Sequence, residues 1–161
     1  MQERKETVQT DENWCIAQDA EVLAVSAQLL EQNRQAYERL SMAQVLTLHE
    51  QIAAQSGGGS GVRETALLEA ALEAPFQTFG GEPLFPTLPA KAARLGYGLI
   101  CNHPMLDGNK RLGAHAMLVF LALNGVHLHY TQQELTQIIL ATASGKVRQE
   151  QLQAWILAHM A

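Results

Sequence analysis

The sequence has little cysteine and no hydrophobic run long enough for a membrane span. Its two cysteines, Cys15 and Cys101, follow no pairing pattern, which excludes a disulfide scaffold and a zinc site built on cysteine pairs. We therefore expect a reducing compartment and a cytoplasmic protein. No apolar stretch reaches the roughly 18–20 residues that a membrane helix needs, so we expect no membrane partner. The opening stretch MQERKETVQTDENW is polar and acidic, which predicts no signal peptide.

Basic residues are also few. The 161 residues include 11 Lys and Arg against 16 Asp and Glu, and the net charge is −5. This balance argues against a large basic face for DNA, although a small basic pocket is compatible with it. Residues 1–40 carry eight acids and four bases, whereas residues 41–161 carry eight acids and seven bases. The first 40 residues therefore supply most of the negative charge.

Apolar residues at helical spacing are plentiful. They make up 47% of the chain, which is enough for one domain with a hydrophobic core. Their periodicity predicts a mainly all-α protein, preceded by a disordered tail over residues 1–13. Helices are expected over about residues 20–40, 42–55, 64–73, 88–101, 111–123, 132–142 and 147–159.

Local signals support these boundaries and predict one hairpin. Ser41 with Gln44, and Thr131 with Glu134, have the spacing of capping boxes. Thr87 can cap the helix that follows it. The stretch FQTFGGEPLFP over residues 76–86 places two glycines between apolar pairs, which predicts an irregular hairpin or flap.

Some conspicuous residues receive a structural interpretation. The run Gly57–Gly61 follows a helix and lacks the spacing of a nucleotide-binding loop, so we interpret it as a flexible turn. His127 and His129 alternate on a short extended segment, but no further metal ligand lies nearby in the sequence. We assign no chemistry to His49, which lies on a predicted helix without an evident partner.

The segment His103–Arg111, HPMLDGNKR, concentrates polar residues between two apolar helices. Gly108 permits a tight turn, and the amides after it, at the start of a helix, can bind phosphate oxygens. The Asn109 side chain can add a donor. Lys110 and Arg111 place two cations where the helix dipole disfavours them, which predicts a bound anion between them.

Two further residues of this loop suit phosphate chemistry. Asp107, an acid beside two basic residues, suits a Mg²⁺ ion that bridges phosphates. His103 carries an imidazole, which can act as a general base near neutral pH. The alternative is a plain connection between helices with solvated charges.

HPMLDGNKR resembles the signature of the Fic/Doc superfamily, H-x-F-x-D-G-N-G-R-x-x-R, with Met105 in place of Phe. The resemblance extends through GVRE at 61–64, LLEAAL at 67–72, PFQTFGG at 75–81, MLVFL at 117–121 and NG at 124–125. It covers residues 41–161, and it implies a catalytic domain there with the Fic/Doc-like helical bundle and a small β-hairpin flap.

Two departures place the chain nearer the Doc, or death-on-curing, toxin branch. Lys110 stands where adenylyltransferases of the superfamily have Gly, and Ala114 stands at the position of their second Arg. The Doc branch shares both changes. The resemblance therefore implies a toxin of a toxin–antitoxin pair that transfers the γ-phosphate of ATP, with Mg²⁺, to a Thr or Ser hydroxyl, with elongation factor Tu as the expected protein substrate. A Fic-type adenylyltransferase and a non-catalytic nucleotide-binding module are the alternatives.

The resemblance also implies residue roles. His103 would deprotonate the substrate hydroxyl, Asp107 would hold the metal, and Gly108, Asn109, Lys110 and Arg111 would bind phosphates. A substrate flap would be formed by Thr78, Phe79, Gly80 and Gly81, for which an ordinary surface loop is the alternative. The role of His115 stays open, since Asn is common at that position in Doc proteins.

Residues 14–40 resemble the short acidic antitoxin helices encoded beside Doc-type toxins, most clearly in EQNRQAYERL at 31–40. Such a helix would complement the cationic loop at Lys110 and Arg111. The inhibitory residues expected there are Glu31, Asn33 and Arg34, acting within the chain or on a neighbouring copy. A helix that merely packs on the bundle is the alternative.

Overall fold

The computed structural model describes residues 39–160. The predicted tail over 1–13, residues 14–38 of the predicted antitoxin-like segment and its candidate inhibitory residues lie outside the described residues. The described part contains six α-helices, α2 (Met42–Ser56), α3 (Thr65–Glu73), α4 (Leu88–Asn102), α5 (Asn109–Leu123), α6 (Gln132–Ala143) and α7 (Gln149–His159). The predicted mainly α-helical fold is confirmed. None of the helices in this part is both long and apolar enough to cross a membrane.

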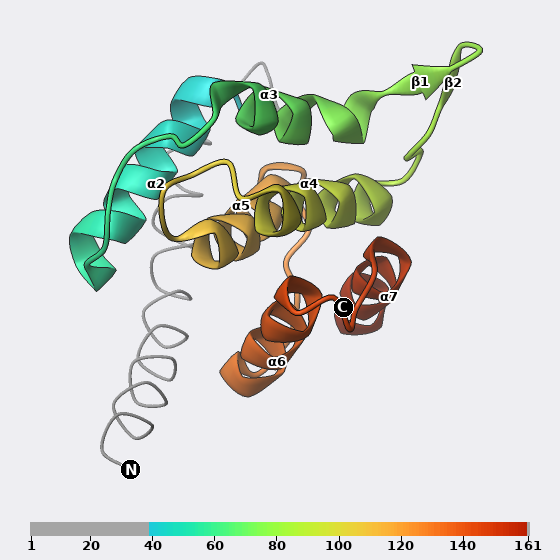
Figure 1. Cartoon of the computed structure of the whole chain (residues 1–161). Helices are drawn as coiled ribbons and strands as arrows, with labels where there is room; N and C mark the ends of the chain where they lie inside the picture. The colour runs from blue at the N-terminus through green and yellow to red at the C-terminus, as the bar shows by residue number, and fades with distance from the viewer. Residues whose placement is uncertain (1–38, 161) are drawn as a thin grey trace.

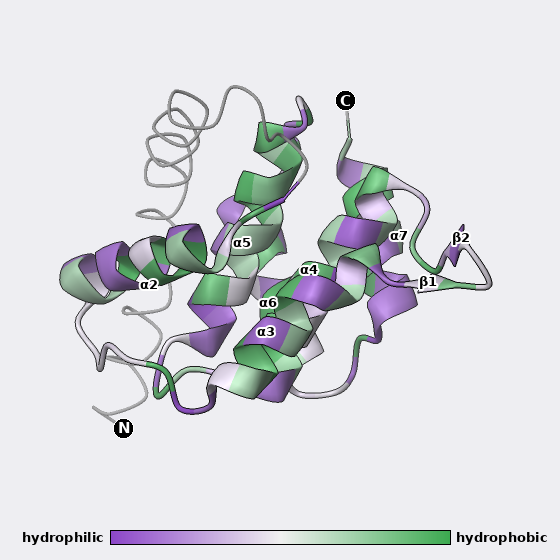
Figure 2. Ribbon diagram, turned by 90° about the horizontal axis from the view of Figure 1, so that it is seen from above, coloured by the Kyte–Doolittle hydropathy of each residue, from purple (hydrophilic) through white to green (hydrophobic). Residues whose placement is uncertain are grey.

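Helix α5 is the centre of the bundle. It packs most extensively on α4 and also contacts α2 and α6, while α4 contacts α7 on its other side. Twelve consecutive residues of α5, from Leu112 to Leu123, are buried, so the helix is enclosed all round rather than amphipathic. Figure 2 shows the apolar character of its ribbon beyond the first turn. The buried body of α5 therefore gives the first turn of this helix, and the loop joined to it, a fixed position.

The helix starts follow the predicted capping chemistry. Ser41 and Thr131 form complete capping boxes, with Gln44 and Glu134 as their partners. Thr87 accepts a hydrogen bond from the Ala90 amide at 3.2 Å. Two predicted starts were wrong by two residues. Helix α5 begins at Asn109 and not at residue 111, because Gly108 already takes the N-cap position. Helix α7 begins at Gln149 because Arg148 takes the extended N-cap conformation.

Pro75 does not end the third helical segment abruptly. The α-helix α3 stops at Glu73, and a 3₁₀ turn, η1 (Ala74–Phe76), continues it through the proline. Proline fits there because the first residues of a helical turn need no amide donor. The turn leads the chain directly into the hairpin.

The predicted hairpin is present as β1 (Thr78–Phe79) and β2 (Glu82–Pro83), with Thr78 opposite Pro83 and Phe79 opposite Glu82. Both strands are exposed. Figure 1 shows the hairpin beside the N-terminal end of α4, whereas the loop His103–Gly108 follows the C-terminal end of that helix. Since α4 has 15 residues, its two ends are about 22 Å apart.

Lys91 holds the base of the hairpin together. Its ammonium group donates to the carbonyl oxygens of Pro75 at 3.2 Å and Phe85 at 2.6 Å, one on each side of the hairpin. The same group lies 5.3 Å from the centroid of the Phe76 ring, close enough for a cation–π contact. One side chain of α4 thus fixes both ends of the exposed segment.

Replacing Lys91 with Met keeps the aliphatic stem and removes both charge-assisted hydrogen bonds. We expect amide exchange in residues 77–84 to become about tenfold faster, which corresponds to about 1.4 kcal/mol of local stability. Hydrogen-exchange mass spectrometry measures this. The control Lys146→Met removes an exposed lysine elsewhere, and equal exchange in the two variants would refute the role of Lys91.

Helix α5 also buries a histidine. The side chain of His115 is 1% exposed. Burial, and to a lesser extent the positive charge of Arg111, lower the pKa of His115 from 6.5 to about 4, because both disfavour the protonated ring. His115, whose role the sequence leaves open, is therefore a neutral imidazole within the core, one turn beyond Arg111.

The depressed pKa predicts a stability that depends on pH. Between about pH 6.5 and pH 4 the unfolded chain binds a proton at His115 that the folded chain does not. The free energy of unfolding should therefore decrease as the pH falls through this window, by up to about 1.4 kcal/mol per pH unit from this group. Denaturant unfolding of the wild type and His115→Asn at pH 7, 5.5 and 4.5 checks this. The variant should lose less stability on acidification, and parallel curves would contradict the assignment.

Candidate functional site

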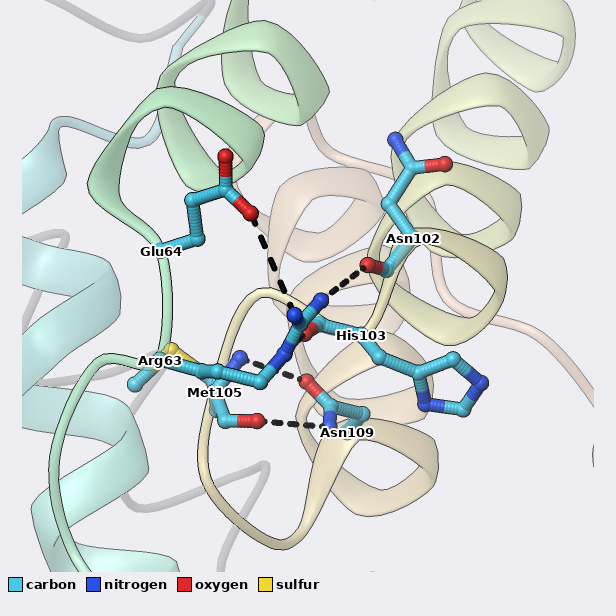
Figure 3. A network of polar contacts seen from close by, with 6 residues as sticks. All are labelled: Arg63, Glu64, Asn102, His103, Met105 and Asn109. Atoms are coloured by element: carbon cyan, nitrogen blue, oxygen red, sulfur yellow. Dashed lines mark hydrogen bonds and ion pairs between the residues drawn. The ribbon is translucent and has the colours of Figure 1, made fainter.

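The loop between α4 and α5 begins with an unusual backbone conformation at His103. This residue caps α4 with φ 50° and ψ 55°, and it is the one non-glycine residue with positive φ among residues 39–160. Such a conformation raises the energy by about 1–3 kcal/mol and persists only where neighbouring contacts enforce it. The imidazole is exposed, and Figure 3 shows it extending away from the contacts around it.

Arg63, just before α3, provides the enforcing contacts. Its Nε donates to the His103 carbonyl at 2.7 Å and its Nη2 donates to the Asn102 carbonyl at 3.2 Å. These carbonyls lie at the C-terminal end of α4, where no further amide of the helix is left to donate to them. The Glu64 carboxylate lies 3.9 Å from Nη1 of the same guanidinium. Arg63 therefore fixes the turn that presents His103 (Figure 3).

The backbone around Arg63 also pairs with the loop. The amides of Arg63 and Glu64 both donate to the Pro104 carbonyl, at 2.8 and 3.1 Å. An isolated antiparallel bridge joins Val62 and Met105. The loop is thus held by a second chain segment, and sequence reasoning missed this role for Arg63 although GVRE contributes to the resemblance.

Asn109 closes the loop from inside. Its Oδ1 accepts from the Met105 amide at 2.9 Å, and its Nδ2 donates to the Met105 carbonyl at 3.1 Å. The predicted contribution of this side chain to phosphate binding stays a prediction. The observed contacts give Asn109 a second task, the folding of residues 105–109 into a compact turn.

The loop ends with a second left-handed residue. Gly108 has φ 76° and ψ 21° and is the N-cap of α5. Its amide donates to Oδ1 of Asp107 at 2.8 Å, which orients that exposed carboxylate. Lys110 is exposed and Arg111 is half-buried in the first turn of α5. Amides and cations thus gather at one helix N-terminus, the arrangement that proteins use to bind phosphate.

Two contacts from α2 reach this loop, and the sequence pattern indicated neither. The Nε2–H of His49, on a buried side chain, donates to the Asp107 carbonyl at 2.8 Å across 58 residues. The Arg111 guanidinium donates to the Ser56 hydroxyl. The run Gly57–Gly61 contains no helix or strand, and Gly58 lies directly against Asp107 and Arg111. No local spacing signals contacts over such separations.

The expected phosphate-site residues therefore lie together on one loop and one helix turn, whereas the candidate flap lies at the opposite end of α4 (Figure 1). In the described part of the chain, no three His, Cys, Asp or Glu side chains converge on a common metal position. Asp107 can still contribute to Mg²⁺ binding, because Mg²⁺ is commonly held by one or two carboxylates together with substrate phosphates and water.

A comparison with known proteins finds the Fic/DOC family. The sequence model of that family matches residues 39–121, slightly more than half of the chain. A region of 72 residues is 44% identical to "Toxin Doc" of Mycolicibacterium smegmatis (strain ATCC 700084 / mc(2)155), covering 45% of this chain and 55% of that protein. The chain thus spans about half the length of the curated relative it matches. The family model covers the whole loop His103–Gly108 and α5 up to Leu121. The chain belongs to the Fic/Doc family.

Proposed function

We propose that this protein is a toxin of a toxin–antitoxin pair and transfers the γ-phosphate of ATP to a Thr or Ser hydroxyl of a translation factor, with elongation factor Tu as the expected substrate. Such a substrate would place its action in the cytoplasm. The proposal rests on one observation: Asp107, Lys110 and Arg111 lie at the N-terminus of α5, and the short loop that leads into this helix begins with the exposed His103. The similarity to "Toxin Doc" supports the toxin role.

Each side chain has one task in the proposed transfer. The imidazole of His103 takes the proton of the substrate hydroxyl, and the hydroxyl oxygen forms a bond to the γ-phosphorus. The bond from that phosphorus to the β–γ bridging oxygen breaks, and ADP leaves. The first-turn amides of α5, with Lys110 and Arg111, offset the negative charge on the phosphates. Positioning and charge stabilisation supply most of the catalysis in such reactions.

The residues fit a Mg²⁺ ion bound together with ATP. Asp107 is the acid of the loop, and its Oδ1 is already oriented by the Gly108 amide. Asp107 would hold the ion, whose contribution when bound would be to neutralise part of the phosphate charge. His49 would keep the Asp107 backbone in place.

Two positions favour γ-phosphate over AMP transfer. Lys110 adds an exposed cation in the first turn of α5, where the adenylyltransferases to which this sequence is compared have Gly. Ala114, at their second Arg position, is fully buried, so this position offers no second phosphate clamp. An adenylyltransferase and a module that binds ATP without turnover are the alternatives.

We further propose that residues 14–40 inhibit the site, with Glu31, Asn33 and Arg34 at the contact. The described chain begins beside α3 and η1: Arg39 pairs with Glu73 at 3.2 Å and lies 4.0 Å from the centroid of the Phe76 ring. The acidic balance of residues 1–40 complements the cations of the loop. The segment 14–40 would occupy the site of its own chain or that of a neighbouring copy.

The test incubates elongation factor Tu with ATP labelled at the γ-phosphate. A form that starts at Arg39 is compared with the full chain, because a start at Met42 would remove the buried Leu40 and the Ser41 cap. We expect the shortened form to label the factor at least tenfold faster than the full chain. His103→Ala should lower the rate by about 10²- to 10⁴-fold.

A parallel reaction uses ATP labelled at the α-phosphate. Label transferred from this position would establish AMP transfer and refute the kinase. ATP binding without transfer of either label would favour the non-catalytic module. Equal rates for the full chain and the shortened form would refute inhibition by residues 14–40 while leaving the kinase intact.

A further inference from the structure

Gly58, in the glycine turn Gly57–Gly61, lies so close to the loop His103–Gly108 that a side chain at this position would require Asp107 to move. A Cβ on Gly58 would stand 2.6 Å from Oδ2 of Asp107 and 3.4 Å from Nη2 of Arg111. The φ of Gly58, +108°, is also one that other residues rarely adopt. Gly61 is similarly restricted, since its Cβ would stand 3.2 Å from Cδ1 of Leu106. The turn therefore lies directly against the loop.

Helix α2, which leads into this turn, contacts the same loop at two other points. Ser56, its last residue, accepts a hydrogen bond from Nη1 of Arg111. The Ser56 hydroxyl in turn donates to the Ile52 carbonyl at 2.5 Å, which fixes its orientation. Two helical turns before Ser56, His49 donates to the Asp107 carbonyl, and its Nε2 would stand 3.5 Å from a Cβ on Gly108.

We propose that His49, Ser56 and Gly58 form a second wall of the phosphate site, and that this wall positions the Asp107 carboxylate and the Arg111 guanidinium for a Mg²⁺-bound nucleotide. These three are positioning residues, since each acts through a residue of the loop. Their importance for phosphate transfer rests on the proposed function, whereas their effect on the order of the loop does not.

Charge separation is the physical reason for such a wall. Asp107 lies just before the N-cap of α5 and Arg111 lies in the first turn of that helix, and the two side chains carry opposite charges. In the described part of the chain they do not form an ion pair: Arg111 is tethered to Ser56, and Asp107 bonds its own Gly108 amide. Both groups border Gly58. The carboxylate thereby stays available to a cation and the guanidinium to an anion.

A matched pair of glycines isolates this contact. Gly57 and Gly58 both have positive φ, +73° and +108°, so alanine strains the backbone at either position. A Cβ on Gly57 meets nothing within 4 Å, whereas a Cβ on Gly58 collides with Asp107. Any difference between the two alanine variants beyond that shared strain therefore reports on the contact with the loop.

The first measurement is amide exchange of residues 105–110 in the full chain. We expect exchange in Gly58→Ala to be at least about tenfold faster than in Gly57→Ala, because the displaced carboxylate releases the Gly108 amide. Thermal melting of both variants shows that each is folded. Equal exchange in the two variants would overturn the proposal.

The second measurement is the affinity for ATP with and without Mg²⁺. Gly58→Ala should reduce the gain in affinity that Mg²⁺ provides by about tenfold or more, because it moves the carboxylate expected to hold the metal. Ser56→Ala should weaken ATP binding to a similar extent with and without Mg²⁺, because it frees Arg111. Thr47→Ala is its control, since Thr47 makes the same kind of bond to its own helix, to Ala43, at 3.0 Å.

The outcomes separate this inference from the proposed function. If the wild type binds ATP and Gly58→Ala lowers the affinity equally with and without Mg²⁺, Gly58 does not position Asp107 for the metal, and the kinase proposal stands. If wild type binds no ATP, the proposed function fails, and the exchange measurement alone decides whether the wall orders the loop.

Discussion

The left-handed turn at His103 is the constraint on which the site depends. A helix end leaves carbonyl groups without partners, and a positive φ at a non-glycine residue adds strain. The Arg63 guanidinium offsets both, since it donates to the last two of these carbonyls. With the turn fixed, the chain leaves α4 and enters α5 through six residues, and the imidazole is presented at the start of this connection.

The central position of α5 gives this loop a rigid base. Because the helix is buried from Leu112 onward, its N-terminal turn moves only if the core does. The loop is then held from three directions: by Arg63 and its neighbours before α3, by Asn109 from inside, and by α2 with the glycine turn. A site preorganised in this way needs little reorganisation when charge moves during a reaction.

Much of the fold could be predicted because its signals are local. Capping boxes span four residues, the hairpin glycines are adjacent, and the signature loop is continuous in sequence. The missed features are long-range. The contacts of Arg63 and His49 with the loop span 40 and 58 residues, and Gly57–Gly61 has the composition of an ordinary flexible turn. The close approach of Gly58 to the Asp107 carboxylate is a contact over 49 residues, which no local spacing signals. Pro75 shows a smaller limit, because proline ends an α-helix yet is accepted in a 3₁₀ turn.

A preorganised phosphate site at the N-terminus of α5 can be detected by backbone amide NMR. The full chain and the form starting at Arg39 are titrated with ATP and Mg²⁺. We expect the largest shift changes on residues 107–112 and on the Arg111 side-chain Nε–H in the shortened form. Changes confined to α6 and α7, with this loop unaffected, would contradict it.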